Sequence, residues 1–337
     1  MIKKWFLFCT ILGIGLTQAQ ENIDDLLAAG ISDAKRFSTD YLMPATDGVA
    51  YGINNGWFNH GKTLNRLGFE LSLSGNIGFI KDEKKSFILD VSEYENVRFP
   101  DDSPSKSVAT ALGHNDPEQT VIVTYDDPIF GDQEVELTLP TGIGSANVNL
   151  IPTAFLQASF APFKGTEIKG RFFPKITTED TKIGLYGIGV QQNFTGFLPA
   201  EKIWPVAISG LVAYTHLDAS YDFTDSSLVD GEEQRVETQV NTFLAELIVS
   251  TKIKIINFYG ALGYMTGTSN SDLLGTYRVT NGVIFSEEII DPFSVKQKVS
   301  GLRTTLGARL KVGFFGFNVD YTLAEFDSAS FGIHFSF

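Results

Sequence analysis

The sequence has almost no cysteine, no excess of positive charge and no long apolar run. Its 337 residues include one Cys, and 26 Lys and Arg against 40 Asp and Glu give a net charge of −14. One cysteine excludes a disulfide scaffold, and the acidic balance excludes a basic nucleic-acid binder, so we expect no nucleic-acid partner. The longest uncharged stretch, residues 137–163, contains Pro140, Pro152 and Pro162, which exclude a transmembrane helix there.

Aromatic residues and glycine are abundant instead. The chain has 28 Phe and 32 Gly, yet its mean hydropathy is only +0.03. An aromatic content of 12% can bury more surface than a disordered chain could, which excludes disorder. The composition leaves two classes open, a soluble β protein and a membrane β-barrel.

The N-terminus has the pattern of a signal peptide. Lys3 and Lys4 precede an uncharged apolar run at residues 5–16, and Ala19 supplies a small residue for cleavage. The run is shorter than the ~20 residues that a membrane-spanning helix needs. We therefore predict a signal peptide over residues 1–19, export to the cell outer membrane, and a mature chain without Cys9.

Apolar and polar residues alternate with period two over long segments, which is the pattern of a strand with two unlike faces. Soluble sandwiches use strands of about five or six residues, whereas a tilted transmembrane strand needs ~9–11. Short and long connections also alternate, as in outer-membrane barrels. The candidate spanning segments are 67–80, 148–161, 166–175, 182–193, 204–223, 236–250, 253–266, 300–312, 315–325 and 328–337.

We therefore predict an all-β fold, an antiparallel transmembrane β-barrel over residues 62–337. Weaker strands at 87–97, 121–125 and 135–139 either span or form a loop hairpin within the acidic connection 81–140, which parity places outside the cell. They set the range at 10–14 strands, with twelve expected. Two segments, 204–223 and 236–250, change apolar phase along their length, which a bulge or an extension beyond the membrane would explain.

The N-terminal residues 20–61 differ from the rest and form a predicted hatch. Apolar residues at helical spacing predict a helix capped by Asn22, with Pro44 beyond its end, followed by a Gly- and Asn-rich connector. This helix has an apolar face to bury, so we expect it to plug the lumen; the alternative is that it rests against the periplasmic mouth. The hatch residues expected to pack inward are Leu26, Leu27, Phe37 and Trp57.

The run 41–44, the Gly, Tyr and Asn residues that lead to Trp57, and the start of the first strand at 67–69 resemble an uncharacterised family of Bacteroidota outer-membrane barrels. The hatch followed by a barrel is distantly similar to FadL-type channels for hydrophobic compounds. That resemblance implies passage of an apolar molecule through a hatch-blocked lumen. The terminal aromatics Phe335 and Phe337 resemble the signal read by the barrel-assembly machinery, which implies that partner.

Charged residues on the polar strand phase should face the lumen, where they form ion pairs that hold strands and hatch together or set selectivity. Small and apolar residues on the same phase favour a plugged or lipophile-conducting barrel. The lumen-facing candidates are Glu70, Glu167, Lys169, Arg171, Arg303, Arg309, Lys311, Asp320 and His334.

Catalytic chemistry has little support. His216, Asp218, Ser220 and Asp222 share one strand face, but no nucleophile motif accompanies them. No histidine has metal-ligand spacing, so we expect no enzyme, no cofactor and no metal. We predict a passive channel for a small hydrophobic solute, with outer-membrane lipid and lipopolysaccharide as partners. A structural, assembly or adhesion barrel is the first alternative, and a barrel hydrolase is the second.

Overall fold

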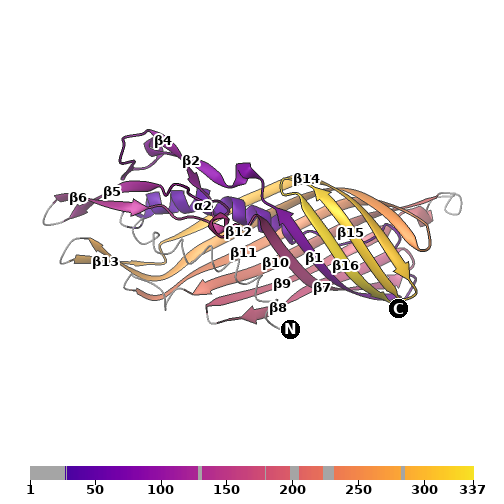
Figure 1. The fold of residues 1–337 in the computed structure, drawn as a ribbon. Helices are drawn as coiled ribbons and strands as arrows, with labels where there is room; N and C mark the ends of the chain where they lie inside the picture. The colour runs from indigo at the N-terminus through magenta and orange to yellow at the C-terminus, as the bar shows by residue number, and fades with distance from the viewer. Residues whose placement is uncertain are drawn as a thin grey trace.

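The computed structural model describes residues 27, 29–127, 131–178, 180–197, 205–222, 231–281 and 285–337. The predicted signal peptide and Leu26 lie outside the described residues. Within them, ten strands wind into a tilted antiparallel barrel (Figure 1). These strands are β1 (Phe69–Phe79), β7 (Leu150–Phe163), β8 (Thr166–Thr177), β9 (Thr181–Asn193), β10 (Val206–Asp222), β11 (Gly231–Thr251), β12 (Ile256–Asn281), β14 (Phe293–Val312), β15 (Phe315–Leu323) and β16 (Ser328–Ser336).

Two strand pairings close the barrel, one between its first and last strands and one between two strands that follow each other in the chain. β1 pairs with β16, for example Leu73 opposite Ile333. β11 pairs with β12, for example Leu247 opposite Leu262. Closure leaves no barrel strand with an unpaired edge. A sheet within a bilayer needs such closure, because lipid cannot hydrogen-bond its backbone N–H and C=O groups.

Over most of the barrel wall the apolar phase of the strands points outward, because the interior is already filled. Leu302 and Leu306 are each more than half exposed, while their neighbours Arg303 and Thr305 are buried. The terminal aromatics Phe335 and Phe337 lie on this outer face too. The described barrel wall therefore has the apolar exterior and filled interior of an outer-membrane barrel.

The barrel has ten strands rather than the twelve expected, although ten is within the expected range. The weak strands of the connection 81–140 pair with one another beyond the barrel. One sheet joins β2 (Ser86–Asp90) to β4 (Ser105–Ala109), and the other joins β3 (Val97–Arg98), β5 (Thr120–Asp127) and β6 (Gly131–Thr138). The two sheets bury Val108, Val121, Val123 and Leu137 against the N-terminal helix, a core that isolated hairpins would lack.

The two ends of the barrel differ. We call the end with the short connections at 163–166, 251–256 and 312–315 the turn end, and the other the loop end. The polar segment 267–298 is largely strand: β12 continues to Asn281, pairs there with β13 (Phe285–Ile290), and β14 begins at Phe293. This part of β12 pairs with β11, with one register shift between Glu232 and Arg235, and with β14, so this wall extends well past the others at the loop end (Figure 1).

The sequence predicts a helix that ends before Pro44. The N-terminal helix α2 (Ile31–Gly52) instead continues through this proline. An internal proline costs a helix about 3 kcal/mol or more. Packing outweighs this cost, because α2 buries Phe37 and Tyr41 before Pro44 and Gly48 and Tyr51 after it. No described helix is long and apolar enough to cross a membrane.

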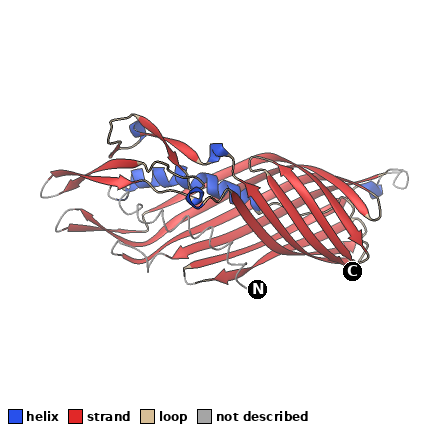
Figure 2. Ribbon diagram, in the orientation of Figure 1, coloured by secondary structure: helices blue, strands red, loops and turns tan. Residues whose placement is uncertain are grey.

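The helix and its connector run the length of the molecule. α2 starts among the small sheets at the loop end and points into the barrel, as the blue helix in Figure 2 shows. Residues 53–66 then pass through the lumen to the turn end, where Leu67 N donates to Ala161 O at the start of the first strand. Trp57 is fully buried in the barrel, whereas Leu27 and Phe37 pack in the cluster under the small sheets.

Candidate functional site

The lumen is filled in two different ways. In its turn-end half, the connector 53–64 lies against charged and polar wall side chains. In its loop-end half, α2 lies against apolar ones. Of the nine charged residues predicted to face inward, eight are buried inside the barrel, and Lys311 is half-exposed at the turn end.

Arg171 on β8 holds the start of the connector. Its Nη1 donates to Ile53 O at 2.5 Å, and its Nη2 donates to Asn55 O at 2.8 Å. The guanidinium lies between the rings of Trp57 and Phe155, 3.9 Å and 3.7 Å from their centroids. Arg171 thus satisfies two backbone carbonyls that have no helix or strand partner, and it fixes the buried tryptophan.

Trp57 fits because β9 has no side chain where its indole lies. A Cβ at Gly187 or Gly189 would come within 3.1 Å of the indole. Both glycines are on the inward phase of β9. The spacing of two between these glycines on the inward phase is a signal in the sequence for a large buried side chain.

Glu70 on β1 is the centre of a second group of contacts. Its carboxylate lies 2.8 Å from Arg309 Nη2 and accepts hydrogen bonds from Asn59 Nδ2 at 2.8 Å and Ser336 Oγ at 2.6 Å. His334 Nδ1 is 3.6 Å from the same carboxylate. These contacts join both strands of the β1–β16 seam to the connector, so one buried carboxylate holds wall and hatch together.

A third group joins Arg303 on β14 to Glu246 on β11 and to the connector. Arg303 Nε lies 3.1 Å from Glu246 Oε1, and Arg303 Nη2 donates to Asn55 Oδ1 at 2.5 Å. Sequence reasoning did not include Glu246. Its place between Ala245 and Leu247, both exposed on the outer face, was the signal that this carboxylate points inward.

The remaining predicted charges also have partners inside the barrel. Lys169 Nζ lies 2.6 Å from Glu167 Oε1, and the other oxygen of Glu167 accepts from Leu64 N at 3.0 Å. Asp320 accepts from Tyr259 Oη at 2.8 Å and from Asn318 Nδ2 at 3.0 Å. All eight buried candidates therefore belong to the polar network around or beneath the connector.

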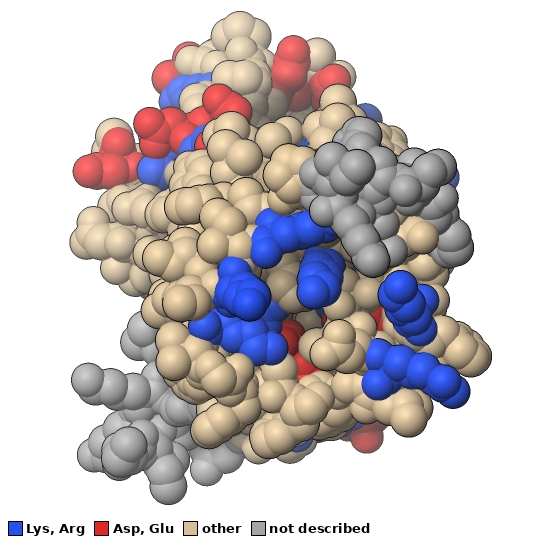
Figure 3. All heavy atoms as spheres, turned by 90° about the vertical axis from the view of Figure 1, so that its right-hand side faces the viewer, with Lys and Arg blue, Asp and Glu red and all other residues tan. Residues whose placement is uncertain are grey.

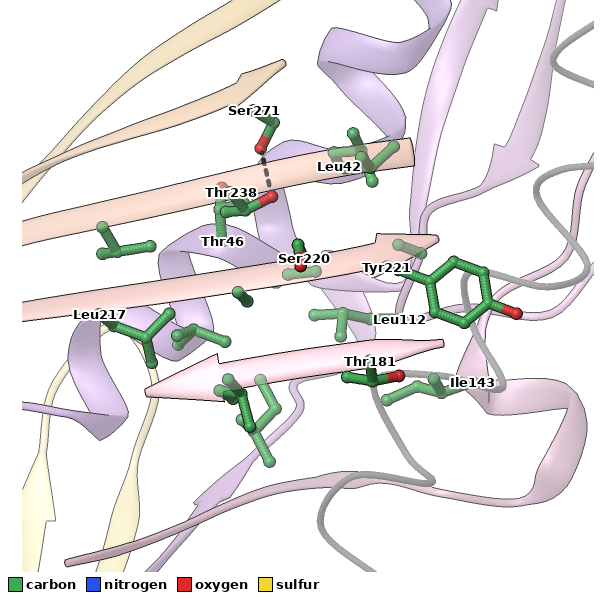
Figure 4. A pocket seen from close by; sticks show the side chains of 18 of the residues that line it. Leu42, Thr46, Leu112, Ile143, Thr181, Leu217, Ser220, Tyr221, Thr238 and Ser271 are labelled. Carbon is green, nitrogen blue, oxygen red and sulfur yellow. Dashed lines mark hydrogen bonds between the residues drawn. The ribbon is translucent and has the colours of Figure 1, made fainter. Parts of the chain in front are cut away.

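The loop-end half contains a cavity of about 140 Å³ between α2 and the wall. Side chains converge on it from α2, from the connection 81–149, and from strands β7 and β9 to β12 (Figure 4). The hydroxyls of Thr238 and Ser271 lie 3.0 Å apart and bond each other. Among the described residues that line the cavity, none is charged. Its main apolar lining residues are Leu42, Ala45, Val49, Leu112, Ile143, Ile151, Ile183, Leu217, Ala219 and Val240.

This cavity explains the two changes of apolar phase seen in the sequence. β10 and β11 pair from Val206 and Thr251 to Asp222 and Arg235 without a shift of register, so no bulge separates the phases. Leu217 and Tyr221 on β10 and Val240 on β11 are instead buried on the inward side. The inward face becomes apolar where it meets α2, and the strands extend beyond the others there.

One acid lies at the edge of this apolar half. The pKa of Asp47 on α2 is raised to about 6, mainly by burial and also by the carboxylate of Glu325, while Lys84 opposes the shift. Lys84 and Glu325 form an ion pair. Asp47 is therefore the acid near the cavity whose charge changes close to neutral pH.

The residues considered for catalysis face away from the lumen. His216 Nε2 lies 3.0 Å from Asp218 Oδ2, and its Nδ1 lies 2.7 Å from Asn241 Oδ1. Its ring packs on Tyr186, with centroids 4.9 Å apart. No described group of three or more His, Cys, Asp or Glu side chains could hold a metal ion.

The turn end has a basic mouth. Figure 3 views the molecule from this end and shows Lys and Arg side chains around a hollow in which some Asp and Glu atoms are visible. The basic residues in or next to the turns and the connector at this end are Lys62, Arg66, Lys164, Lys252, Lys254 and Lys311.

A family model matches residues 1–337, the whole chain. The chain belongs to the family of unknown function DUF6588. A search of curated proteins found no match.

Solved structures with a similar fold include outer-membrane barrels. Ail, the attachment invasion locus protein of Yersinia pestis, is 7% identical with a TM-score of 0.27 over 81% of this chain and 100% of Ail. The translocator domain of the autotransporter NalP from Neisseria meningitidis is 10% identical with a TM-score of 0.27 over 91% and 98%. The transport unit of AIDA-I from Escherichia coli is 6% identical with a TM-score of 0.28 over 86% and 97%.

Proposed function

We propose that this chain is an outer-membrane barrel that admits a small, uncharged hydrophobic solute from the loop end, which faces the cell exterior. The apolar cavity between α2 and strands β9 to β12 carries the proposal. A polar barrel lumen has no need of such a lining, and a cavity with convergent apolar walls is the usual form of a small-molecule site. The distant resemblance of the hatch to that of FadL-type channels points the same way.

The cavity limits the solute. A dry apolar cavity of about 150 Å³ admits a molecule the size of benzene, so a cavity of about 140 Å³ suits one aromatic ring or a short alkyl chain. Hydroxyls such as those of Thr46 and Thr181 could accept one polar group at the rim. A charged ligand is disfavoured, because none of the described lining residues is a cation or a carboxylate that would compensate for its desolvation.

Passage requires the hatch to move. Beyond the cavity, the connector and its ion pairs fill the described lumen, and Trp57 is fully buried. The proposed channel is therefore gated. The solute binds first beside α2, and displacement of α2 and the connector opens a path to the turn end.

A disulfide between hatch and wall tests the gate. A Cβ built on Gly52, the last residue of α2, would lie 4.0 Å from Thr153 Cβ on β7, which is the separation that a disulfide needs. The Gly52→Cys/Thr153→Cys variant is compared in its oxidised and reduced forms. The measurement is uptake of radiolabelled toluene by intact cells, whose lipopolysaccharide leaflet slows apolar solutes.

The matched control links two wall strands and leaves the hatch free. A Cβ on Gly184 would lie 3.5 Å from Lys175 Cβ, so Gly184→Cys/Lys175→Cys joins β9 to β8. We expect oxidation to stop uptake in the hatch variant and to leave the control unchanged. Equal uptake by the oxidised and reduced hatch variants would exclude a moving hatch, and no uptake above cells without the barrel would exclude a channel.

A non-transport barrel is the second candidate, and the polar network favours it. Arg171, Glu70 and Arg303 each bind both wall and connector, so moving the hatch would break several buried contacts. In that case the cavity would still bind toluene in purified protein, but expression of the barrel would not raise cellular uptake. Binding measured by the toluene-dependent rise in unfolding temperature separates these two outcomes.

A further inference from the structure

The basic residues at the turn end differ from those at the loop end. Lys62, Arg66, Lys254 and Lys311 form no ion pair with a described carboxylate. At the loop end, by contrast, Lys85 pairs with an acid of its own connection. Arg98 and Lys106 do the same with Glu134 and Asp101, at 2.9 Å each.

The sequence around the turns explains the difference. Residues 60–66, 162–166, 251–256 and 311–316 contain no Asp or Glu, although the whole chain has 40 acids against 26 bases. Acids are therefore absent from the sequence of these four segments, although the remaining connection at this end, residues 194–205, contains Glu201. The described carboxylates of Glu70 and Glu167 are buried and already paired inside the barrel.

All of these cations except Lys62 follow or precede an apolar residue that is exposed on the outer wall. Lys164 follows Phe163, which is 67% exposed, and Arg66 precedes Leu67, which is 66% exposed. Lys254 lies between two exposed isoleucines of the β11–β12 turn. Further apolar side chains at this rim are Val312, Phe314 and Phe337, all of which are at least 60% exposed.

We propose that this basic rim, made of Arg66, Lys164, Lys252 and Lys254 with Lys62 and Lys311 at the mouth, binds the phosphate headgroups of anionic phospholipid in the periplasmic leaflet. A cation beside an exposed apolar side chain matches a lipid, whose phosphate lies directly above its acyl chains. The rim is also continuous with the apolar outer wall, so a lipid bound there needs no separate groove. Basic residues near an anionic bilayer surface are attracted to its headgroups.

The inference goes beyond the proposed solute channel and does not depend on it. Lipid binding at the rim involves the outer surface of the turn end, whereas the solute cavity lies inside the loop end. A barrel that transports nothing could still bind anionic lipid here, and a channel could function without it.

The experiment measures which lipid stays with the purified full-length protein. The protein is equilibrated in mixed micelles of detergent with equal amounts of phosphatidylglycerol and phosphatidylcholine, and the ratio of the two lipids that co-purify is determined. The test variant is Arg66→Gln/Lys164→Gln/Lys254→Gln. The matched control, Lys85→Gln/Arg98→Gln/Lys106→Gln, removes the same charge from the loop end. Heat-modifiable electrophoretic mobility reports whether each variant is folded.

We expect the wild type and the control to retain phosphatidylglycerol in preference, and the rim variant to lose at least about fivefold of that preference. High salt should reduce the wild-type preference, because exposed charges are screened. A wild-type ratio equal to that of the input would overturn the proposal whether or not any variant folds. So would an equal loss in rim variant and control. Equal displacement by soluble glycerol phosphate and by the lipid would assign the rim to free phosphate instead.

Discussion

The two halves of the lumen are filled by the same N-terminal segment in two backbone states, and the wall differs accordingly. In the loop-end half the segment is the helix α2, whose backbone groups bond one another, so the wall needs only to be apolar. In the turn-end half it is an irregular connector, whose N–H and C=O groups need partners. Gln191, Asn193 and Arg171 supply them there.

The comparison shows how a barrel interior can be both charged and apolar. The chemistry of the wall follows the conformation of what it surrounds. At Gly61 the connector comes so close that a Cβ would meet Ala207 O at 2.9 Å, and the Ser250 hydroxyl accepts from Gly61 N at 3.0 Å. The turn-end half should therefore tolerate change poorly, and the half with the cavity should tolerate it well.

The largest expected effect comes from Glu70→Ala. Removing this carboxylate leaves Arg309 buried without its ion pair, which typically costs about 3–5 kcal/mol. The measurement is the free energy of unfolding from a urea titration in lipid vesicles. Glu83→Ala, at an exposed acid of the loop end, is the control and should change it by less than about 0.5 kcal/mol.

The double variant Glu70→Ala/Arg309→Met checks the cause. If an unpaired buried charge is responsible, removing Arg309 as well should recover part of the loss. A loss for Glu70→Ala that stays below about 1 kcal/mol, or no recovery in the double variant, would contradict the view that charge pairing stabilises the turn-end half.

Arg171→Lys should have the next largest effect. Lysine keeps the charge but cannot donate to Ile53 O and Asn55 O at once or stack flat on Trp57, so we expect a loss of about 2–3 kcal/mol. In a Trp204→Phe background the emission of Trp57 should shift to the red as its packing loosens. Arg66→Lys, at an exposed position, should show neither change.

Much of the fold was predictable because it depends on period two. The ten segments that satisfied the alternation correspond to the ten barrel strands, and the expected count of twelve rose only because the strands of the connection 81–140 have the same local pattern. The sequence of a short strand does not show whether it pairs with a barrel strand or with a strand of a neighbouring hairpin. Pro44 misled in a similar way, since a local rule for ending helices was overridden by packing on both of its sides.

The candidate site was predictable in part for the same reason. The charges placed on the inward phase are buried as a group, but their partners on the connector, Asn55 and Asn59, could not be identified. An irregular segment has no repeating pattern of apolar and polar residues, so its sequence does not show which of its residues contacts which strand. The sequence indicated the apolar cavity only indirectly, through the change of apolar phase along β10 and β11. The structure shows that this change occurs where the two strands face α2.

A third experiment compares the two halves directly on one strand. Ala207 and Ala219 both point inward from β10, Ala207 against the connector and Ala219 into the cavity. Ala207→Phe overfills a packed region and should cost about 1–3 kcal/mol, or more if the connector is displaced. Ala219→Phe fills existing space and should cost less than about 1 kcal/mol while abolishing toluene binding. Equal losses in the free energy of unfolding for the two variants would show that the two halves of the lumen do not differ in packing.

The smallest expected effect is a dependence on pH in the apolar half. Burial raises the pKa of Asp47 to about 6, above the ordinary value of 3.8, so the folded protein holds this proton more tightly than the unfolded chain. The stabilisation is full below pH 3.8 and is lost as the pH rises through about 6. We expect Asp47→Asn to flatten the fall in unfolding temperature between pH 4 and pH 7, whereas Glu83→Gln at an exposed site should not. An unchanged profile in Asp47→Asn would show that this acid titrates as it does in water, and that the edge of the apolar half is open to solvent.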